Sequence, residues 1–256
     1  MTNMNLYEAM YARHSVRKYR KEAVEDSVIE GIFRFLDETE PLFPEIRIRI
    51  QVFPERGKKL RFSGFSNVSA PHYLAVFTEK KEKSEMNAGY VMQQIALYLT
   101  SQGVGTCYQG MAGMPRNSQQ EEGLSCVMVM AFGYPKGRGK NQESRRLPME
   151  ELCVFKGQPK THVREMLEAA RLAPSSFNGQ PWRFAVYENR FHVFSKKESG
   201  FRRKRNPHSE FNFGIMLAHV MVAAEELWVD VDLIKLDNIT HIALPNNQYV
   251  LSVILR

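Results

Sequence analysis

The stretch APSSFNGQPW, residues 173–182, stands between two different sequence patterns. Before it, THVREMLEAARL has the apolar spacing of an amphipathic helix, and after it RFAVYENRFHVF predicts two strands around a turn. Four hydrogen-bonding side chains, Ser175, Ser176, Asn178 and Gln180, lie between its two prolines. The stretch is therefore either a stiff loop or a polar shelf held rigid for a ligand.

The same order of patterns occurs twice along the chain. The first half predicts helices over 4–12, 25–37 and 85–102 and strands over 45–53, 71–77 and 126–135. The second half predicts helices over 162–173 and 211–228, a hairpin over 183–195 and a strand over 248–256. A shift of 125 residues sets NAGYVMQQ on NFGIMLAH and CVMVMA on LSVILR without a gap.

This repetition predicts an α+β protein with antiparallel-rich sheets flanked by helices and two structural copies, 1–150 and 151–256. The second copy is too small for a comfortable core of its own, so we expect one compact unit.

Composition narrows the class of protein. The chain is 43% hydrophobic and 25% charged, which is typical of a globular protein, and no apolar run is long enough to cross a membrane. The N-terminus lacks the apolar centre of a signal peptide. Three cysteines without paired spacing or histidine partners predict a reducing compartment, hence the cytoplasm, and no metal site.

The net charge of +7 raises the possibility of an anionic partner. The densest basic run is FRRKRNPH, residues 201–208, but no recognisable nucleic-acid-reading motif accompanies it. A solvated loop is the favoured interpretation, with a nucleic-acid-binding protein as the alternative. The same positive field attracts small molecules that carry phosphate.

Three further stretches bear on function. In RHSVRKY, Arg13, Ser15 and Arg17 stand at alternate positions, so an extended backbone would project them to one side. Two guanidiniums there would match the oxygens of a phosphate. The alternative is a basic segment after a helix that stays in water. SRRLP supplies a second basic pair, unless it is an ordinary linker. GVGTCYQGM, residues 103–111, follows a helix and so is no dinucleotide fingerprint, but its small residues allow a flat ligand to approach; the alternative is a helix cap and turn.

Together, RHSVR, GVGTCYQG, GYP with SRRLP, and APSSFNGQPW resemble the FMN-dependent nitroreductase superfamily over nearly the whole chain. A typical member carries RxSxR and PSSxNxQPW in one copy, and two identical chains build the flavin sites between them. In this sequence the first motif is in copy one and the second in copy two. The chain thus resembles a branch in which two half-units are fused into an internal pseudo-dimer.

The resemblance implies a set of FMN-binding residues. The arginines with Ser15 would hold the phosphate, His14 would shape the turn, the backbone of 108–110 would lie near the flavin N5, and 174–178 would contact the flavin held by the other copy. Gln180 and Pro181 would fix the loop, with Trp182 in the core. The full set is Arg13, His14, Ser15, Arg17, Tyr108, Gln109, Gly110, Arg145, Arg146, Pro174, Ser175, Ser176 and Asn178.

The implied activity is electron transfer from NAD(P)H to an electron-poor acceptor such as a nitroaromatic or quinone, the two substrates binding in turn. The flavin is the reactive group, so no catalytic side chain is expected. The alternative is a flavin-binding protein with little turnover. We expect one FMN per chain, no nucleic-acid or membrane partner, and a monomeric pseudo-dimer or a homodimer.

Overall fold

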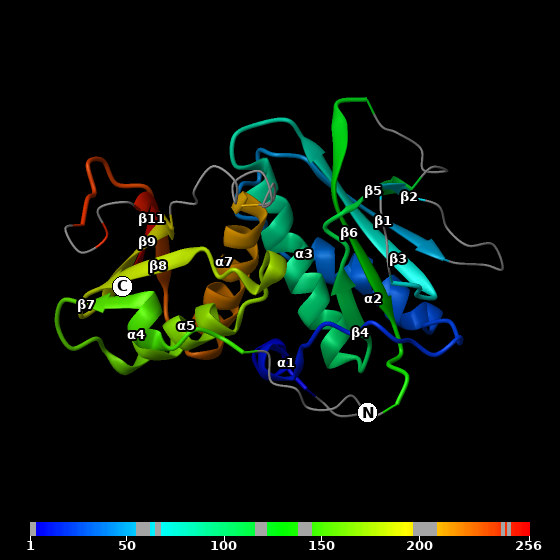
Figure 1. The fold of residues 1–256 in the computed structure, drawn as a ribbon, viewed down its shortest axis with the longest axis horizontal. Helices are drawn as coiled ribbons and strands as arrows, with labels where there is room; N and C mark the ends of the chain where they lie inside the picture. Colours follow the sequence, from blue (N-terminus) through cyan, green and yellow to red (C-terminus); the bar gives the residue numbers. More distant parts are fainter. Residues whose placement is uncertain are drawn as a thin grey trace. The chain divides into compact units, whose positions relative to one another are not determined.

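The computed structural model describes residues 4–54, 62–64, 68–115, 122–137, 145–196, 209–241, 244 and 247–256. The chain divides into two compact units, Met1–Ser144 and Arg145–Arg256 (Figure 1). Each unit combines helices with a mostly antiparallel sheet, which confirms the predicted α+β class. The basic run 201–208 lies outside the described residues.

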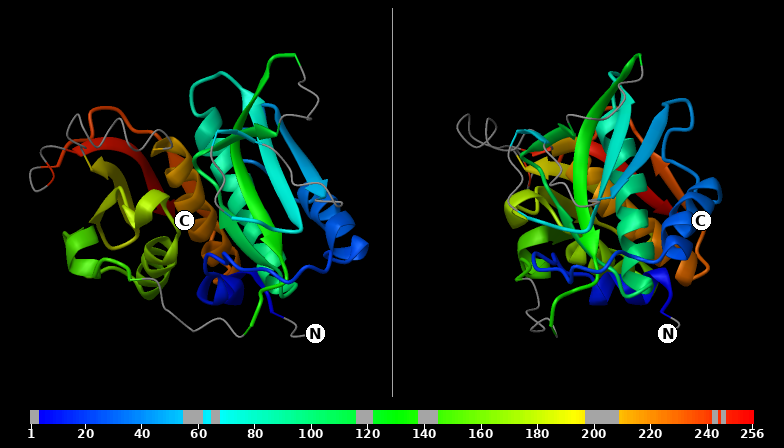
Figure 2. Two further views of the ribbon diagram at one scale, coloured as in Figure 1. Left: turned by 45° about the vertical axis from the view of Figure 1, so that its right-hand side comes forward. Right: turned by 90° about the vertical axis from the view of Figure 1, so that its right-hand side faces the viewer.

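The first unit is built around a four-stranded antiparallel sheet with the order β1-β3-β6-β4. Helix α3 packs along this sheet against β3 and β4 (Figure 2). The elements are α1 (Leu6–Ala12), α2 (Asp26–Asp37), β1 (Ile48–Pro54), β2 (Phe62–Gly64), β3 (His72–Glu79), α3 (Ser84–Ser101), β4 (Gly105–Tyr108), β5 (Ala112–Pro115) and β6 (Leu124–Gly133).

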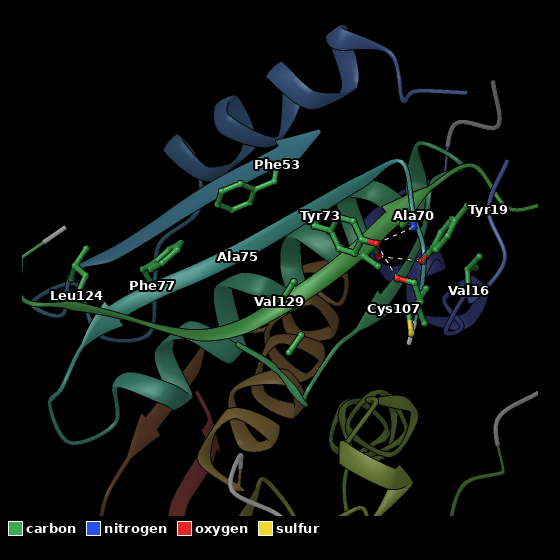
Figure 3. Close-up of a cluster of buried hydrophobic side chains, with 13 residues drawn as sticks. Val16, Tyr19, Phe53, Ala70, Tyr73, Ala75, Phe77, Cys107, Leu124 and Val129 are labelled. Atoms are coloured by element: carbon green, nitrogen blue, oxygen red, sulfur yellow. Dashed lines mark hydrogen bonds between the residues drawn. The ribbon is translucent and has the colours of Figure 1, made fainter. Parts of the chain in front are cut away.

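A cluster of buried side chains covers one face of this sheet (Figure 3). It takes Tyr73, Ala75 and Phe77 from alternate positions of β3, as the two-residue period of a strand requires. Val16 and Tyr19 join the cluster from the segment after α1. The Tyr19 hydroxyl donates to the Ala131 carbonyl at 3.1 Å, which satisfies a polar group inside an apolar cluster.

The second unit contains a five-stranded sheet with the order β10-β11-β9-β8-β7, in which only β7 is parallel to its neighbour. Helices α5 and α7 pack against each other. The elements are α4 (Met149–Leu152), β7 (Cys153–Phe155), α5 (Thr161–Leu172), the short 3-10 helix η1 (Ser176–Asn178), β8 (Trp182–Val186), β9 (Arg190–Lys196), α7 (Ser209–Glu226), β10 (Val231–Ile234) and β11 (Asn247–Leu255).

Both units follow one plan. Two antiparallel strands are followed by a long helix and two more strands, and the last strand inserts beside the second: β1-β3-β6-β4 in one unit and β8-β9-β11-β10 in the other. Helices α3 and α7 begin and end 125 residues apart. Most residues of both helices are buried, on every side of each helix, as expected for helices without a polar face.

The structure adds strands that the sequence patterns did not predict. The residues GTCY form β4, so the glycine-rich stretch is strand as well as turn, and β10 follows the end of α7 in the same way. The division between the units falls after Ser144, a few residues before the boundary expected from the sequence, so that Arg145 and Arg146 belong to the second unit.

Candidate functional site

The segment that carries Arg13, Ser15 and Arg17 is fixed along the edge of β4. Ser15 pairs with Thr106 in a parallel bridge, and the Val16 amide donates to the Thr106 carbonyl at 2.9 Å. Val16 sits directly over Gly105, where an added Cβ would lie 2.5 Å from its Cγ2 atom. The absence of a side chain at this glycine is therefore what allows the segment to approach the sheet.

Arg13 is a buried cation. The residue is 7% exposed, its Nε atom has no hydrogen-bond partner, and no ion pair to it occurs among the described residues. Burial lowers the pKa of its guanidinium, because the charged form loses its hydration. A buried charge without a partner destabilises the folded protein unless an anion binds to it.

Arg17 is exposed, so the two arginines differ in environment although they alternate in sequence. Both nevertheless act on the Cys107 thiol: burial raises the pKa of Cys107, and Arg17 and Arg13 each oppose that rise. Both guanidiniums therefore favour negative charge at Cys107 of β4. His14 is exposed, and its Nδ1 donates to the Ala12 carbonyl at 3.2 Å, a local turn contact.

The turn after β4 is held by its own polar groups. The Tyr108 hydroxyl donates to Gln93 Oε1 at 2.9 Å, and burial raises the pKa of Tyr108. The Gln109 amide donates to the Val129 carbonyl at 2.8 Å, and its side-chain Nε2 donates to the Cys107 carbonyl at 3.1 Å. The backbone N–H of Gln109 is thus already used within the sheet, whereas Gly110 lies on the exposed side of the turn.

In the second unit, the segment 174–180 is a loop with unusual backbone angles. Phe177, Asn178 and Gln180 have φ values of 52°, 54° and 44°, in the left-handed region that non-glycine residues rarely adopt. Such conformations persist where surrounding contacts impose them. Phe177 is 83% exposed at the tip of this loop.

Those contacts come largely from the polar residues of the loop. The Ser175 hydroxyl accepts from the Gln180 amide at 2.9 Å, and the Ser175 carbonyl accepts from the Asn178 amide at 2.9 Å. The Gln180 Oε1 atom accepts from the Leu147 amide at 2.9 Å. Trp182 is fully buried, which confirms its predicted place in the core. The conformation of the loop is therefore fixed by its own polar groups together with the Leu147 amide.

Arg146 joins this loop to the end of α5. Its Nε and Nη2 atoms donate to the Leu172 carbonyl at 3.2 and 2.9 Å, and Nη1 donates to Asn178 Oδ1 at 2.8 Å. The Asn178 Nδ2 atom in turn donates to the Arg145 carbonyl at 2.6 Å. A cation at a helix C-terminus is favourable, so Arg146 has a structural role within its unit. That Arg146 and Arg145 contact the FMN phosphate stays a prediction.

Other kinds of site are not formed by the described part of the chain. Its histidine, cysteine and acidic residues make no cluster that would hold a metal ion. Cys107, Cys126 and Cys153 are all free thiols. None of the helices in the described ranges is both long enough and apolar enough to span a bilayer.

Two half-units that share one strand order define a nitroreductase-like α+β fold. The first carries the arginine segment along β4, and the second carries the polar loop between α5 and β8. A family model described as “Putative TM nitroreductase” matches residues 5–224. The chain belongs to this nitroreductase family.

Among solved structures, one match with a TM-score above 0.5 supports the fold, and weaker matches accompany it. A nitroreductase-type protein from Thermotoga maritima matches with a TM-score of 0.67 and 20% identity over 100% of this chain and 94% of that one. A nitroreductase family protein from Clostridium difficile 630 gives 0.49 and 18%, over 60% and 100% of the two chains. An FMN-dependent nitroreductase from Clostridium difficile R20291 gives 0.43 and 14%, over 56% and 99%. No curated protein sequence matches.

Proposed function

We propose that this nitroreductase-family protein is an FMN-dependent oxidoreductase that passes electrons from NAD(P)H to an electron-poor acceptor such as a nitroaromatic or a quinone. The observation that carries the proposal is the buried guanidinium of Arg13, whose Nε atom has no hydrogen-bond partner and which forms no ion pair within the described part of the chain. The FMN phosphate is a dianion with several acceptor oxygens, so it fits both the charge and the orphaned Nε donor.

Arg13, Ser15 and Arg17 would hold this phosphate, each from the segment that β4 fixes in place. Arg13 would donate from the buried side and Arg17 from the exposed side. When bound, FMN would supply the redox chemistry by taking up hydride from NAD(P)H and returning electrons to the acceptor. The turn of Tyr108 and Gly110 and the loop of Pro174, Ser175, Ser176 and Asn178 would position the flavin, as the resemblance to the superfamily implies.

The protein's own nucleophiles do not suggest a competing chemistry. Burial raises the pKa of Cys107, and it raises the pKa values of Cys126 and Cys153 to about 11 and about 12. These thiols are therefore protonated at neutral pH, and the thiolate is the reactive form of cysteine. Free thiols also suit a reducing compartment, which supports our proposal of a cytoplasmic location.

The test begins with the visible absorbance of the purified protein and of its acid-released flavin. Bound FMN, together with oxidation of NADH or NADPH that depends on an added quinone, supports the proposal. FMN that binds without turnover would favour a storage or sensing role. A protein that neither retains FMN nor binds it when it is added would refute the proposal.

A further inference from the structure

Asn212, on α7, contacts the loop that carries PSSFN. Its Oδ1 atom accepts from the Ser176 amide at 2.9 Å and from the Ser176 hydroxyl at 3.3 Å. Asn212 is 1% exposed, so these hydrogen bonds are shielded from solvent. A buried donor that loses its acceptor is destabilising. Ser176 directly precedes Phe177 and Asn178, two of the residues with left-handed backbone.

The first unit contains the same device. Asn87 occupies the fourth position of α3, as Asn212 does in α7, and it is fully buried. Its Oδ1 atom accepts from the Phe43 amide at 3.1 Å, and its Nδ2 atom donates to the Phe43 carbonyl at 2.9 Å. Phe43 lies between α2 and β1, just as Ser176 lies between α5 and β8.

Each asparagine thus holds one residue of a helix-to-strand loop, between α2 and β1 in the first unit and between α5 and β8 in the second. The two loops differ in composition. The second contains the Ser and Asn side chains of PSSFN, whereas the first reads ETEPLFPE and has none of them.

From these contacts we infer that Asn212 is a positioning residue for the proposed flavin site: it fixes Ser176, and through Ser176 the conformation of 175–178. The effect of Asn212 on FMN binding rests on the proposed function, whereas its effect on the conformation of the loop does not. Asn87 performs the same positioning for a loop without the PSSFN side chains. It therefore serves as a matched control within the same chain.

The experiment compares Asn212→Leu, Asn212→Asp and Asn87→Leu with the wild type. Hydrogen exchange of the flavin-free protein reports directly on the amides of Ser176, Asn178 and Gly179, all of which donate within this loop or to Asn212. FMN affinity is measured separately by quenching of FMN fluorescence.

Asn212→Leu should speed exchange of these amides about two- to tenfold, the effect of losing one ordinary hydrogen bond, and weaken FMN binding by a similar factor. Asn212→Asp keeps the accepting oxygen and should restore slow exchange and FMN binding. Asn87→Leu should speed exchange at Phe43 and leave 174–180 and FMN affinity unchanged. Exchange within α7 shows whether the Asn212 variants are folded, and exchange within α3 shows the same for Asn87→Leu.

Unchanged exchange at 174–180 in folded Asn212→Leu would overturn the positioning role. Faster exchange with unchanged FMN affinity would overturn the link from loop to flavin. If the wild type binds no FMN at all, the proposed function fails, and the exchange data alone still decide whether Asn212 positions the loop.

Discussion

Replacing Arg13 should change flavin binding and stability in opposite directions. Arg13→Met keeps a long unbranched side chain and removes the buried charge. In the flavin-free protein that charge has no ion-pair partner among the described residues, and burial lowers its pKa. The variant without flavin should therefore be more stable than the wild type without flavin.

The magnitudes follow from the same geometry. A buried unsatisfied polar group costs about 1–3 kcal/mol, and a Tm rises by about 2–4 °C per kcal/mol in chains approaching this size. Flavin-free Arg13→Met should thus melt a few degrees higher. A hydrogen bond to a charged group contributes about 1.5–3 kcal/mol, so FMN affinity should fall about ten- to 150-fold.

The assay is thermal unfolding of the flavin-free proteins, with and without inorganic phosphate, and FMN titration of the same samples. Arg17→Met is the control: its side chain is exposed, so it should weaken FMN binding without raising the Tm. Phosphate should raise the Tm of the wild type and not that of Arg13→Met. An Arg13→Met variant that binds FMN as tightly as the wild type, or that melts well below it, would refute the assignment of Arg13 to an anion site.

Three other outcomes are expected. Gly105→Ala would force Val16 away from β4, so it should cost about 1–3 kcal/mol in urea unfolding and weaken FMN binding, whereas Gly157→Ala, with open space around its Cβ, should do neither. Burial, and then Arg190 and His241, lower the pKa of His192, so the unfolded chain takes up more protons below its ordinary pKa near 6.5. The free energy of unfolding should therefore fall as pH drops through that range. Between pH 7.5 and 5.5, His192→Gln should lose less of this free energy than the wild type does; an equal loss in both proteins would exclude His192 as a cause. Released flavin should amount to one FMN per chain, because RxSxR and PSSxNxQPW each occur once, and a ratio near two would contradict this.

Sequence periodicity predicted the long elements because their apolar residues repeat with the spacing of a helix or a strand. The shift of 125 residues predicted α3 and α7 in register, and both ends of the two helices obey it. Strand β4 was missed because four residues that begin with glycine carry too short a pattern. Its existence depends on pairing with β6, a contact between segments distant in sequence.

The candidate site shows the same limit. Alternation in RHSVR placed Arg13 and Arg17 on one side, but it gave no sign that one would be buried and the other exposed, because burial depends on how the segment docks on β4. The contact of Arg146 with Leu172 and Asn178 joins residues 26 and 32 positions apart. No local pattern predicts such a pair. The order of the motifs predicts that the two halves carry different parts of the site, and this stays a prediction.

The two asparagines give a physical reason why the halves could diverge without losing their fold. Asn87 bonds both backbone groups of Phe43, and Asn212 accepts the backbone amide of Ser176. A hydrogen bond to the backbone does not depend on which side chains the loop carries. A loop with the sequence ETEPLFPE can therefore be held between helix and strand as well as one with PSSFN. Loss of the motif in one half would then remove a ligand site and leave the packing intact. A buried asparagine thus bonds the backbone of this loop in each half, while the proposed chemistry requires the loop composition of only one half.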